Sequence, residues 1–156
     1  MYRLIELFRQ AGLNVQASDS IRSDLWAKTL YNCALNPLGA ILGVPYGRLA
    51  DSHSWAIIQR VMEEAFAVCQ AESIPLRWAA ATEYLEYLKT IQLPATADHH
   101  ASMLQDIRQG RETEIDYLNG AVVRLGKEHG IATPTNLTLV ELIRFITKQK
   151  HQADLH

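Results

Sequence analysis

Apolar residues recur at intervals of three and four along most of this 156-residue chain, and no other feature of the sequence restricts the fold as strongly. Such spacing places apolar side chains on one face of an α-helix. The clearest stripe follows Ser52 and consists of Trp55, Ile58, Met62, Ala65, Phe66 and Cys69. Strand patterns are nearly absent, apart from one short extended segment at 13–16. The sequence therefore predicts an all-α fold, a compact multi-helix bundle.

Capping and breaking residues divide this pattern into separate helices. Asp19 and Ser20 are expected to cap a long helix over 21–42. Pro37 is expected to bend or break that helix, because proline lacks a backbone donor. A loop is expected at 43–47. A second helix is expected to begin near 52 and to end before Pro75, and a third to run from there to just before Pro94, with a loop at 93–98. Further helices are expected over 99–109, 113–130 and 136–148.

The two ends of the chain differ from its middle. Residues 2–12 form a short amphipathic stretch, which a turn and a brief extended segment separate from the first long helix. The last residues have no apolar face, which favours a solvated end. We therefore expect a tail from another domain at 1–18, a helical domain at 19–149 and a frayed C-terminus at 150–156.

The composition argues against several classes of protein. A net charge of -2 with both signs scattered gives no broad basic surface, so no nucleic-acid partner is expected. No apolar run is long enough to cross a bilayer and the start is charged, so we expect a cytoplasmic protein without a membrane partner. Cys33 and Cys69 lie in apolar helical patterns and are expected to be buried free thiols. Adjacent His99 and His100 point in different directions on a helix, so no metal site is expected.

No phosphate-binding turn is recognisable in this chain. The closely spaced glycines Gly39 and Gly43 fall in a helical pattern, and neither GxGxxG after a strand nor GxxxxGK[ST] occurs. Such turns place backbone N–H groups around a pyrophosphate. We therefore expect no cofactor-binding residues in this chain taken alone.

Three polar residues spaced by four form a row on the first long helix. Lys28, Asn32 and Asn36 advance by about 40° per step and share one side of an otherwise apolar helix. Polar groups in such a place need hydrogen-bond partners. Two interpretations stay open at this point. Lys28 extends to solvent while the asparagines bond to neighbouring segments, or the lysine acts as a general acid beside an anionic substrate.

Three longer motifs carry a resemblance to a known family. They are WAKTLYNCALNPLGAILG, SMLQDIRQGRETEIDYLNG and EHGIATPTN, in this order. Together they resemble the C-terminal domain of the ketopantoate reductase (2-dehydropantoate 2-reductase) family over nearly the whole chain. The resemblance implies a helical domain like the C-terminal domain of 6-phosphogluconate dehydrogenase. It also implies that residues 1–18 are the last helix and extended segment of a missing Rossmann domain.

The resemblance assigns roles to individual residues. Lys28 matches the general acid that donates a proton to the substrate's carbonyl oxygen, and Glu114 matches the glutamate that positions this lysine and binds the substrate's hydroxyl. Asn32 and Asn36 match asparagines that face the substrate and the lysine. Ser102 matches a serine that bonds the substrate carboxylate. On the residues alone, Glu114 is equally a favourable acid in a first helical turn, and Ser102 a surface hydroxyl.

The implied activity is an NADPH-dependent reduction of ketopantoate to pantoate in pantothenate biosynthesis, or of a related 2-keto acid. The chain alone is expected to be inactive, because the Rossmann domain that would hold NADPH is a missing partner. One position departs from the family: Tyr46 replaces a substrate-binding asparagine in Pro45-Tyr46-Gly47, and either lines a reshaped pocket or packs on the loop. The alternative function is a non-catalytic module for homodimerisation or ligand sensing.

Overall fold

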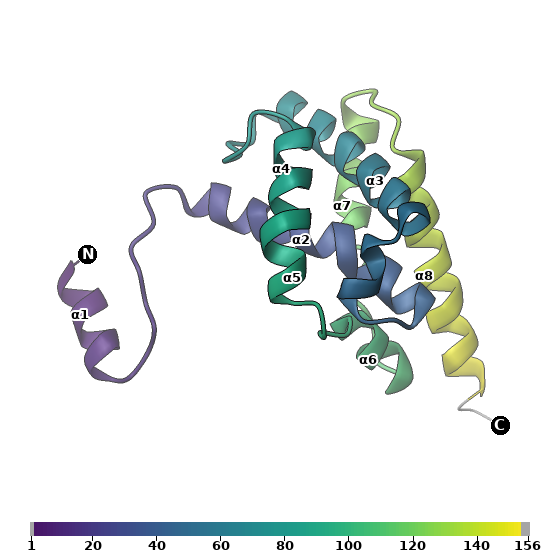
Figure 1. Ribbon diagram of the computed structural model, residues 1–156, viewed down its shortest axis with the longest axis horizontal. Helices are drawn as coiled ribbons and strands as arrows, with labels where there is room; N and C mark the ends of the chain where they lie inside the picture. Colours follow the sequence, from purple (N-terminus) through teal and green to yellow (C-terminus); the bar gives the residue numbers. More distant parts are fainter. Residues whose placement is uncertain (1, 154–156) are drawn as a thin grey trace.

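The computed structural model describes residues 2–153 and forms helices, with no strand, over that range. This confirms the predicted all-α bundle. The helices surround the long central helix, and the first helix stands apart from the body (Figure 1). The elements in chain order are α1 (Tyr2–Gln10), α2 (Ile21–Leu42), the 3₁₀ helix η1 (Tyr46–Ala50), α3 (Ser52–Ala71), α4 (Ala81–Tyr87), the π-helical turn η2 (Leu88–Gln92), α5 (Leu93–Ala95), α6 (Ser102–Arg108), α7 (Asn119–Glu128) and α8 (Pro134–Ala153).

Helix α2 forms the centre of the bundle and packs against α3, α6 and α8. Its second half, residues 33–40, is buried throughout, because apolar residues cover nearly its whole circumference. The helix ends at Gly43, whose left-handed backbone (φ +67°) favours glycine, and the Gly43 N–H donates to Gly39 O at 2.9 Å. At the other end Ser20 is the N-cap residue, but its side chain makes no capping bond, so that part of the prediction was wrong.

Pro37 does not break α2, so of the two expected outcomes, a bend or a break, the break was wrong. A residue at this position would normally donate its N–H to the carbonyl oxygen of Cys33, four residues earlier. The Asn119 side chain supplies a replacement donor, with Nδ2 lying 3.2 Å from Cys33 O. The helix continues because a distant segment satisfies the acceptor that proline leaves free.

Asn119 belongs to a group that we call the closed polar cluster, formed by the half-buried Glu64 and the buried Asn119 and Asn136. The same Asn119 amide donates to Asn136 Oδ1 at 2.9 Å. Asn136 Nδ2 donates to Glu64 Oε2 at 2.7 Å, and the Glu64 carboxylate accepts the backbone N–H groups of Thr135 and Asn136 at 2.8 and 2.9 Å. Glu64 on α3 thus caps the first turn of α8.

Helix α3 carries the predicted core stripe. All six residues from Trp55 to Cys69 named for it are buried. Cys33 and Cys69 are buried free thiols, as predicted, and burial raises the pKa of Cys69 to about 12. Burial also raises the pKa of Cys33. These thiols therefore stay protonated at neutral pH and contribute packing.

Several predicted boundaries were wrong. Helix α7 begins at Asn119 instead of Thr113, because residues 111–114 are irregular, 115–118 form turns, and Leu118 leaves helical geometry (φ -97°, ψ -102°). Helical backbone continues past 93 into α5, where Pro94 lies in the first turn and needs no donor. Helix α6 is shorter than 99–109. Helix α8 runs to Ala153, beyond the expected end at 148, and residues 154–156 lie outside the described part.

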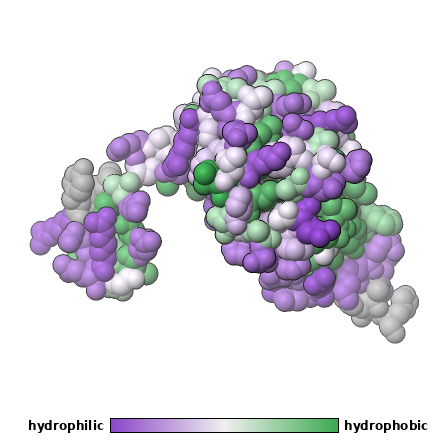
Figure 2. Space-filling view, viewed as in Figure 1, coloured by the Kyte–Doolittle hydropathy of each residue, from purple (hydrophilic) through white to green (hydrophobic). Residues whose placement is uncertain are grey.

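Helix α1 and the irregular segment after it extend away from the body (Figure 1). Its apolar side chains Leu4, Leu7 and Phe8 are exposed. The space-filling view shows hydrophobic side chains on this helix with no part of the bundle over them (Figure 2). The segment folds back only locally, through Arg9 Nε, which donates to Val15 O at 3.1 Å.

Candidate active site

The row of Lys28, Asn32 and Asn36 runs along α2 from the surface into the core. Lys28 is exposed, Asn32 is half-buried and Asn36 is buried, with 2% of its surface accessible. Exposure decreases along the row because the first turns of α2 project beyond the helices that cover its second half (Figure 1). Only the Lys28 end of the row is therefore directly accessible to a solute.

Asn36 and Ser102 are brought together by the packing of α6 on α2. Asn36 Nδ2 donates to Ser102 Oγ at 3.1 Å, and Asn36 Oδ1 accepts the backbone N–H of Met103 at 3.2 Å. The buried amide thus uses both ends to fix the first turn of α6, while the Ser102 side chain remains exposed. The buried Asn36 therefore positions the exposed Ser102 hydroxyl.

Tyr46 is buried at the start of η1, against α2. Its ring lies so close to Gly39 that a Cβ there would come within 3.2 Å of it. The ring also meets Tyr31 edge to face, with centroids 6.1 Å apart. Burial, and secondarily Tyr31, raises the pKa of Tyr46 to about 12. Tyr46 is thus packed against α2, and its role as a substrate-binding residue stays a prediction.

Glu114 lies in the turns between α6 and α7, and its side chain is exposed. Within residues 2–153 no ion pair or hydrogen bond joins it to Lys28. The structure therefore does not bring these two predicted catalytic residues into contact. The pairing of Glu114 with Lys28 stays a prediction.

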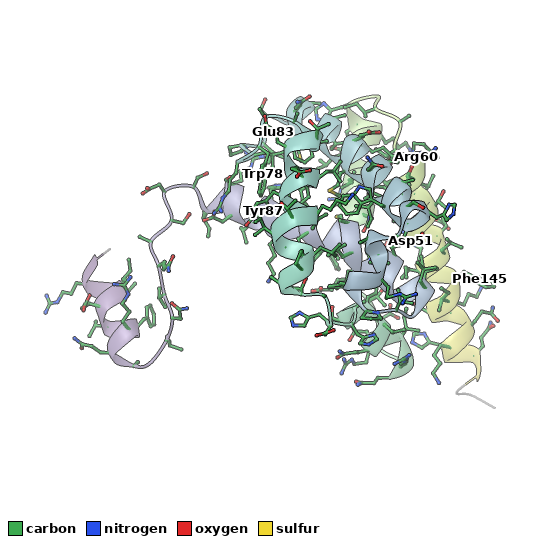
Figure 3. All side chains as sticks on the ribbon, viewed as in Figure 1. Asp51, Arg60, Trp78, Glu83, Tyr87 and Phe145 are labelled. Atoms are coloured by element: carbon green, nitrogen blue, oxygen red, sulfur yellow. The ribbon has the colours of Figure 1, made fainter. Side chains whose placement is uncertain are left out.

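A cavity of about 570 Å³ opens beside Lys28, between the first half of α2 and the α4–α5 segment. We call it the Lys28 cavity. Its walls include three aromatic residues that the sequence did not indicate as site residues, and Trp78 and Tyr87 lie close together beside α4 (Figure 3). The residues that matter below are Lys28, Tyr31, Trp78, Tyr87, Gln92 and Thr96. Tyr31 could have been found, since it follows Lys28 by three residues.

The charges around this cavity are unevenly compensated. Asp24 pairs with Arg77 and accepts from Ser18 Oγ at 2.5 Å. The hydrogen bonds from Ser18 and Arg77 lower the pKa of Asp24 below its ordinary value. Lys28, one turn along, has no ion-pair partner within the described residues. The ammonium is thus the uncompensated charge at the mouth of the cavity.

A short hydrogen-bonded chain fixes the inner wall. Tyr31 Oη donates to Thr96 Oγ1 at 2.8 Å, and Thr96 Oγ1 donates to the backbone oxygen of Gln92 at 2.8 Å. The side-chain oxygen of Gln92 is buried without a partner. A buried acceptor left unpaired costs free energy.

Other kinds of site find no support in the same residues. No group of three or more histidine, cysteine, aspartate or glutamate side chains in the described chain could hold a metal ion. Among helices in the described part, none combines the length and apolar character needed to cross a membrane. The pyrophosphate-binding strand, turn and helix of a nucleotide domain does not occur between residues 2 and 153.

Solved structures show where this fold recurs. A PanE/ApbA family ketopantoate reductase from Ralstonia eutropha JMP134 has a TM-score of 0.85 and 37% identity, and the match covers 96% of this chain and 49% of that one. A ternary complex of D-mandelate dehydrogenase with NADH and anilino(oxo)acetate has a TM-score of 0.83 and 32% identity, and the match covers 95% of this chain and 48% of that one.

Curated relatives agree with these structures. A 2-dehydropantoate 2-reductase from Aquifex aeolicus is 39% identical over 142 residues, 90% of this chain and 46% of that protein. One from Shigella flexneri is 40% identical over 126 residues, which are 81% of this chain and 40% of that protein. The chain thus spans less than half of each. Residues 20–147 match the family described as ketopantoate reductase PanE/ApbA C terminal, so this chain belongs to that family as its C-terminal domain.

Proposed function

We propose that this chain is the substrate-binding and proton-donating domain of a nicotinamide-dependent 2-oxo acid reductase. The observation that carries the proposal is the unpaired Lys28 ammonium at the mouth of a cavity large enough for a small acid. Ketopantoate is the substrate that the names of the curated relatives suggest. The D-mandelate dehydrogenase complex supports the wider class, because anilino(oxo)acetate is a 2-oxo acid derivative.

The chemistry of such a reduction explains what Lys28 would do. The nicotinamide, when bound, supplies a hydride to the carbonyl carbon. The carbonyl oxygen then needs a proton, which Lys28 donates from its ammonium group, and solvent later returns a proton to the amine. The same positive charge attracts the substrate carboxylate during binding. An exposed ammonium at the cavity mouth suits both tasks.

The cofactor would be held mainly by another domain. The described residues contain no glycine-rich turn after a strand, so nothing in them fits a pyrophosphate. The relatives are more than twice as long as their matching parts, which leaves room for a nucleotide-binding domain. The family resemblance favours NADPH, while the D-mandelate dehydrogenase complex contains NADH, so both are to be assayed.

Residues 1–18 fit the end of that other domain. Helix α1 leaves its apolar side chains exposed and makes no close packing with the bundle, as expected if a neighbouring domain covers it. The match to the Ralstonia eutropha reductase covers 96% of the chain and so extends into this region. We propose the boundary between the two domains near residue 18.

The remaining predicted residues take supporting roles in the proposal. Ser102, fixed by Asn36, offers an exposed hydroxyl to the substrate carboxylate. Asn32, half-buried one turn from Lys28, would bond the substrate or the lysine. Glu114 would orient Lys28 once the second domain closes the cleft. Tyr46 acts indirectly, by packing against Tyr31 in the cavity wall.

The proposal is tested by restoring the missing half. Residues 19–156 are fused to the part of the Aquifex aeolicus relative that this chain does not match, and oxidation of NADPH and NADH is followed with ketopantoate and other 2-oxo acids. The intact relative serves as the positive control. We expect turnover with at least one 2-oxo acid. A fusion protein that folds and binds the nucleotide but reduces none of them would overturn the proposal.

Self-association is a second candidate function, favoured by a different surface. Apolar side chains are exposed along the side formed by the end of α2, α3 and α8, where Figure 2 shows hydrophobic residues on the body and Figure 3 labels Phe145. They are Leu42, Ile57, Leu137, Leu142 and Phe145. Sedimentation of the chain at several concentrations decides this candidate. A monomer at all of them would exclude it, and a dimer dispersed by Phe145→Glu would support it.

A further inference from the structure

The Lys28 cavity has one charged end and one aromatic wall. We define the aromatic wall as Tyr31, Trp78 and Tyr87, all of which line the cavity. Trp78 and Tyr87 have ring centroids 5.4 Å apart with planes tilted by 40°. Tyr87 is 38% exposed although it is aromatic, and the neighbouring Ile91 is 56% exposed. These apolar surfaces have no covering partner in the described chain, and they face a space that Lys28 closes from the other side.

Buried residues hold Trp78 in the wall from behind. Trp78 packs edge to face on Tyr84 with centroids 4.7 Å apart, and Tyr84 is completely buried. Tyr84 in turn lies 5.9 Å from Phe66 in the core. Rings already fixed in place lose little conformational freedom when a ligand binds, which favours affinity.

Tyr31 is fixed by a separate pair of contacts. Its hydroxyl donates to Thr96, and its ring meets the buried Tyr46 edge to face. Tyr46 therefore supports the aromatic wall through Tyr31 and does not itself line the cavity. An asparagine there would leave the Tyr31 ring without this aromatic contact.

The distribution of charge indicates which end of a ligand lies where. The Asp24 carboxylate is already engaged by Arg77 and Ser18, so it adds little repulsion toward an anion. Lys28 is left to attract a carboxylate or carbonyl oxygen. The part of the ligand that points away from Lys28 then lies against ring faces and Ile91, which favour an apolar, flat group.

We propose that this cavity selects 2-oxo acids whose side chain is an aromatic ring, in preference to branched aliphatic acids that carry a hydroxyl. This inference rests on the proposed function and refines it by naming the class of substrate. Trp78 and Tyr87 are the residues that determine the preference, and Tyr46 acts as a positioning residue through Tyr31. Ring stacking on the wall supplies the discrimination, because a hydroxylated aliphatic side chain would lose water there without gaining a stacking partner.

The test measures binding to the whole chain as it is, by calorimetry, with phenylglyoxylate and ketopantoate as probes. Phenylglyoxylate is expected to bind at least about tenfold more tightly. Tyr87→Ala, on an exposed side chain, is expected to reduce that preference to about threefold or less, and Trp78→Leu to do the same. Tyr117→Ala is the matched control, since Tyr117 is 83% exposed and lies outside the cavity. Circular dichroism of each variant verifies that it is folded.

The outcomes separate the inference from the proposed function. Equal binding of the two acids, or a preference that Tyr87→Ala leaves unchanged, overturns the aromatic selection even if Lys28→Met abolishes binding of both. If neither of the two acids binds, the aromatic selection is also overturned. That result indicates that the aromatic wall is instead covered by the second domain. In each of these cases the proposed reductase function is decided separately, by turnover of the fusion protein with ketopantoate and other 2-oxo acids.

Discussion

The closed polar cluster and the Lys28 cavity both lie against α2, yet their polar groups are treated in opposite ways. In the cluster, the Glu64 carboxylate and both side-chain amides find partners inside the protein, with only Asn119 Oδ1 left over. At the cavity, Lys28 has no ion-pair partner among the described residues and the Gln92 side-chain oxygen is unpaired. Most polar groups of the cluster are therefore satisfied within the fold, whereas the Lys28 ammonium is left open to a ligand.

This contrast distinguishes residues that share a motif. WAKTLYNCALNPLGAILG contains both Lys28, which opens to solvent, and Pro37, whose missing donor is replaced by Asn119. Asn119 itself belongs to the motif that also contains the proposed orienting residue Glu114. A variant in either region should therefore affect either reaction or stability, and seldom both.

The largest expected effect is on catalysis at Lys28. In the fusion protein, Lys28→Met is expected to lower kcat by about 10²- to 10⁴-fold, because the proton donor is lost. The melting temperature should change little, since the side chain is exposed. Lys127→Met, also on an exposed helical lysine, is the control and should retain activity. Equal kcat values for the two variants would remove Lys28 from the mechanism.

The next largest effect is on stability at the closed polar cluster. Asn119→Ala should lower the free energy of unfolding by about 2–4 kcal/mol, because Cys33 O and Asn136 Oδ1 lose a buried donor. In a Pro37→Ala background the loss should be smaller by about 1 kcal/mol, since the substituted alanine then provides its own backbone N–H to Cys33 O. Urea unfolding of the four proteins measures this coupling. Strictly additive changes would show that Asn119 does not compensate for Pro37.

A smaller effect of opposite sign is expected in the core behind the aromatic wall. The Tyr84 hydroxyl is buried without a hydrogen-bond partner, and burial raises the pKa of this side chain. Tyr84→Phe removes the unpaired group and keeps the ring, so unfolding should become harder by about 0.5–1 kcal/mol. Thermal melting checks the sign. A clear loss of stability would mean that the hydroxyl has a partner after all.

The smallest expected effect is the pH dependence at Asp24. Its pKa is lowered in the folded protein, so its stabilising contribution is present above the ordinary value of 3.8 and is lost as the pH falls through the lower folded value. Melting temperatures of the protein and of Asp24→Asn should therefore differ slightly at about pH 6 and converge toward about pH 2, with Asp98→Asn as an exposed control. A difference independent of pH would contradict an electrostatic origin.

Apolar periodicity in the sequence predicted those helices whose bounds depend on neighbouring residues alone. The bounds of α2 and the stripe on α3 follow directly from apolar spacing and terminal glycine. The continuation of α2 through Pro37 was not predictable, because it depends on the Asn119 side chain, which lies 86 positions from Cys33 in the sequence and which no local pattern connects to it. The late start of α7 has the same origin, since Asn119 is held in the core by partners from other helices.

The candidate site was predictable only in part. Spacing by four identified the row on α2, and the family motifs added Ser102, which the fold joins to Asn36. The aromatic wall was missed because Trp78 precedes α4 and Tyr87 ends it, so their approach to Lys28 depends on how α4 packs. Tyr46 was singled out from the sequence as a candidate substrate-binding residue, but burial gives it a supporting place that its sequence neighbours do not indicate.

The most direct test of a ligand site at the Lys28 cavity is a nuclear magnetic resonance titration of the isotopically labelled chain with phenylglyoxylate and, separately, ketopantoate. We expect the largest shifts at Lys28, Thr96 and the Trp78 indole N–H, and none at the side-chain amides of Asn119 and Asn136 in the closed polar cluster. Shifts confined to another part of the surface, or no shifts around Lys28 with either acid, would contradict the assignment of this cavity as the substrate site.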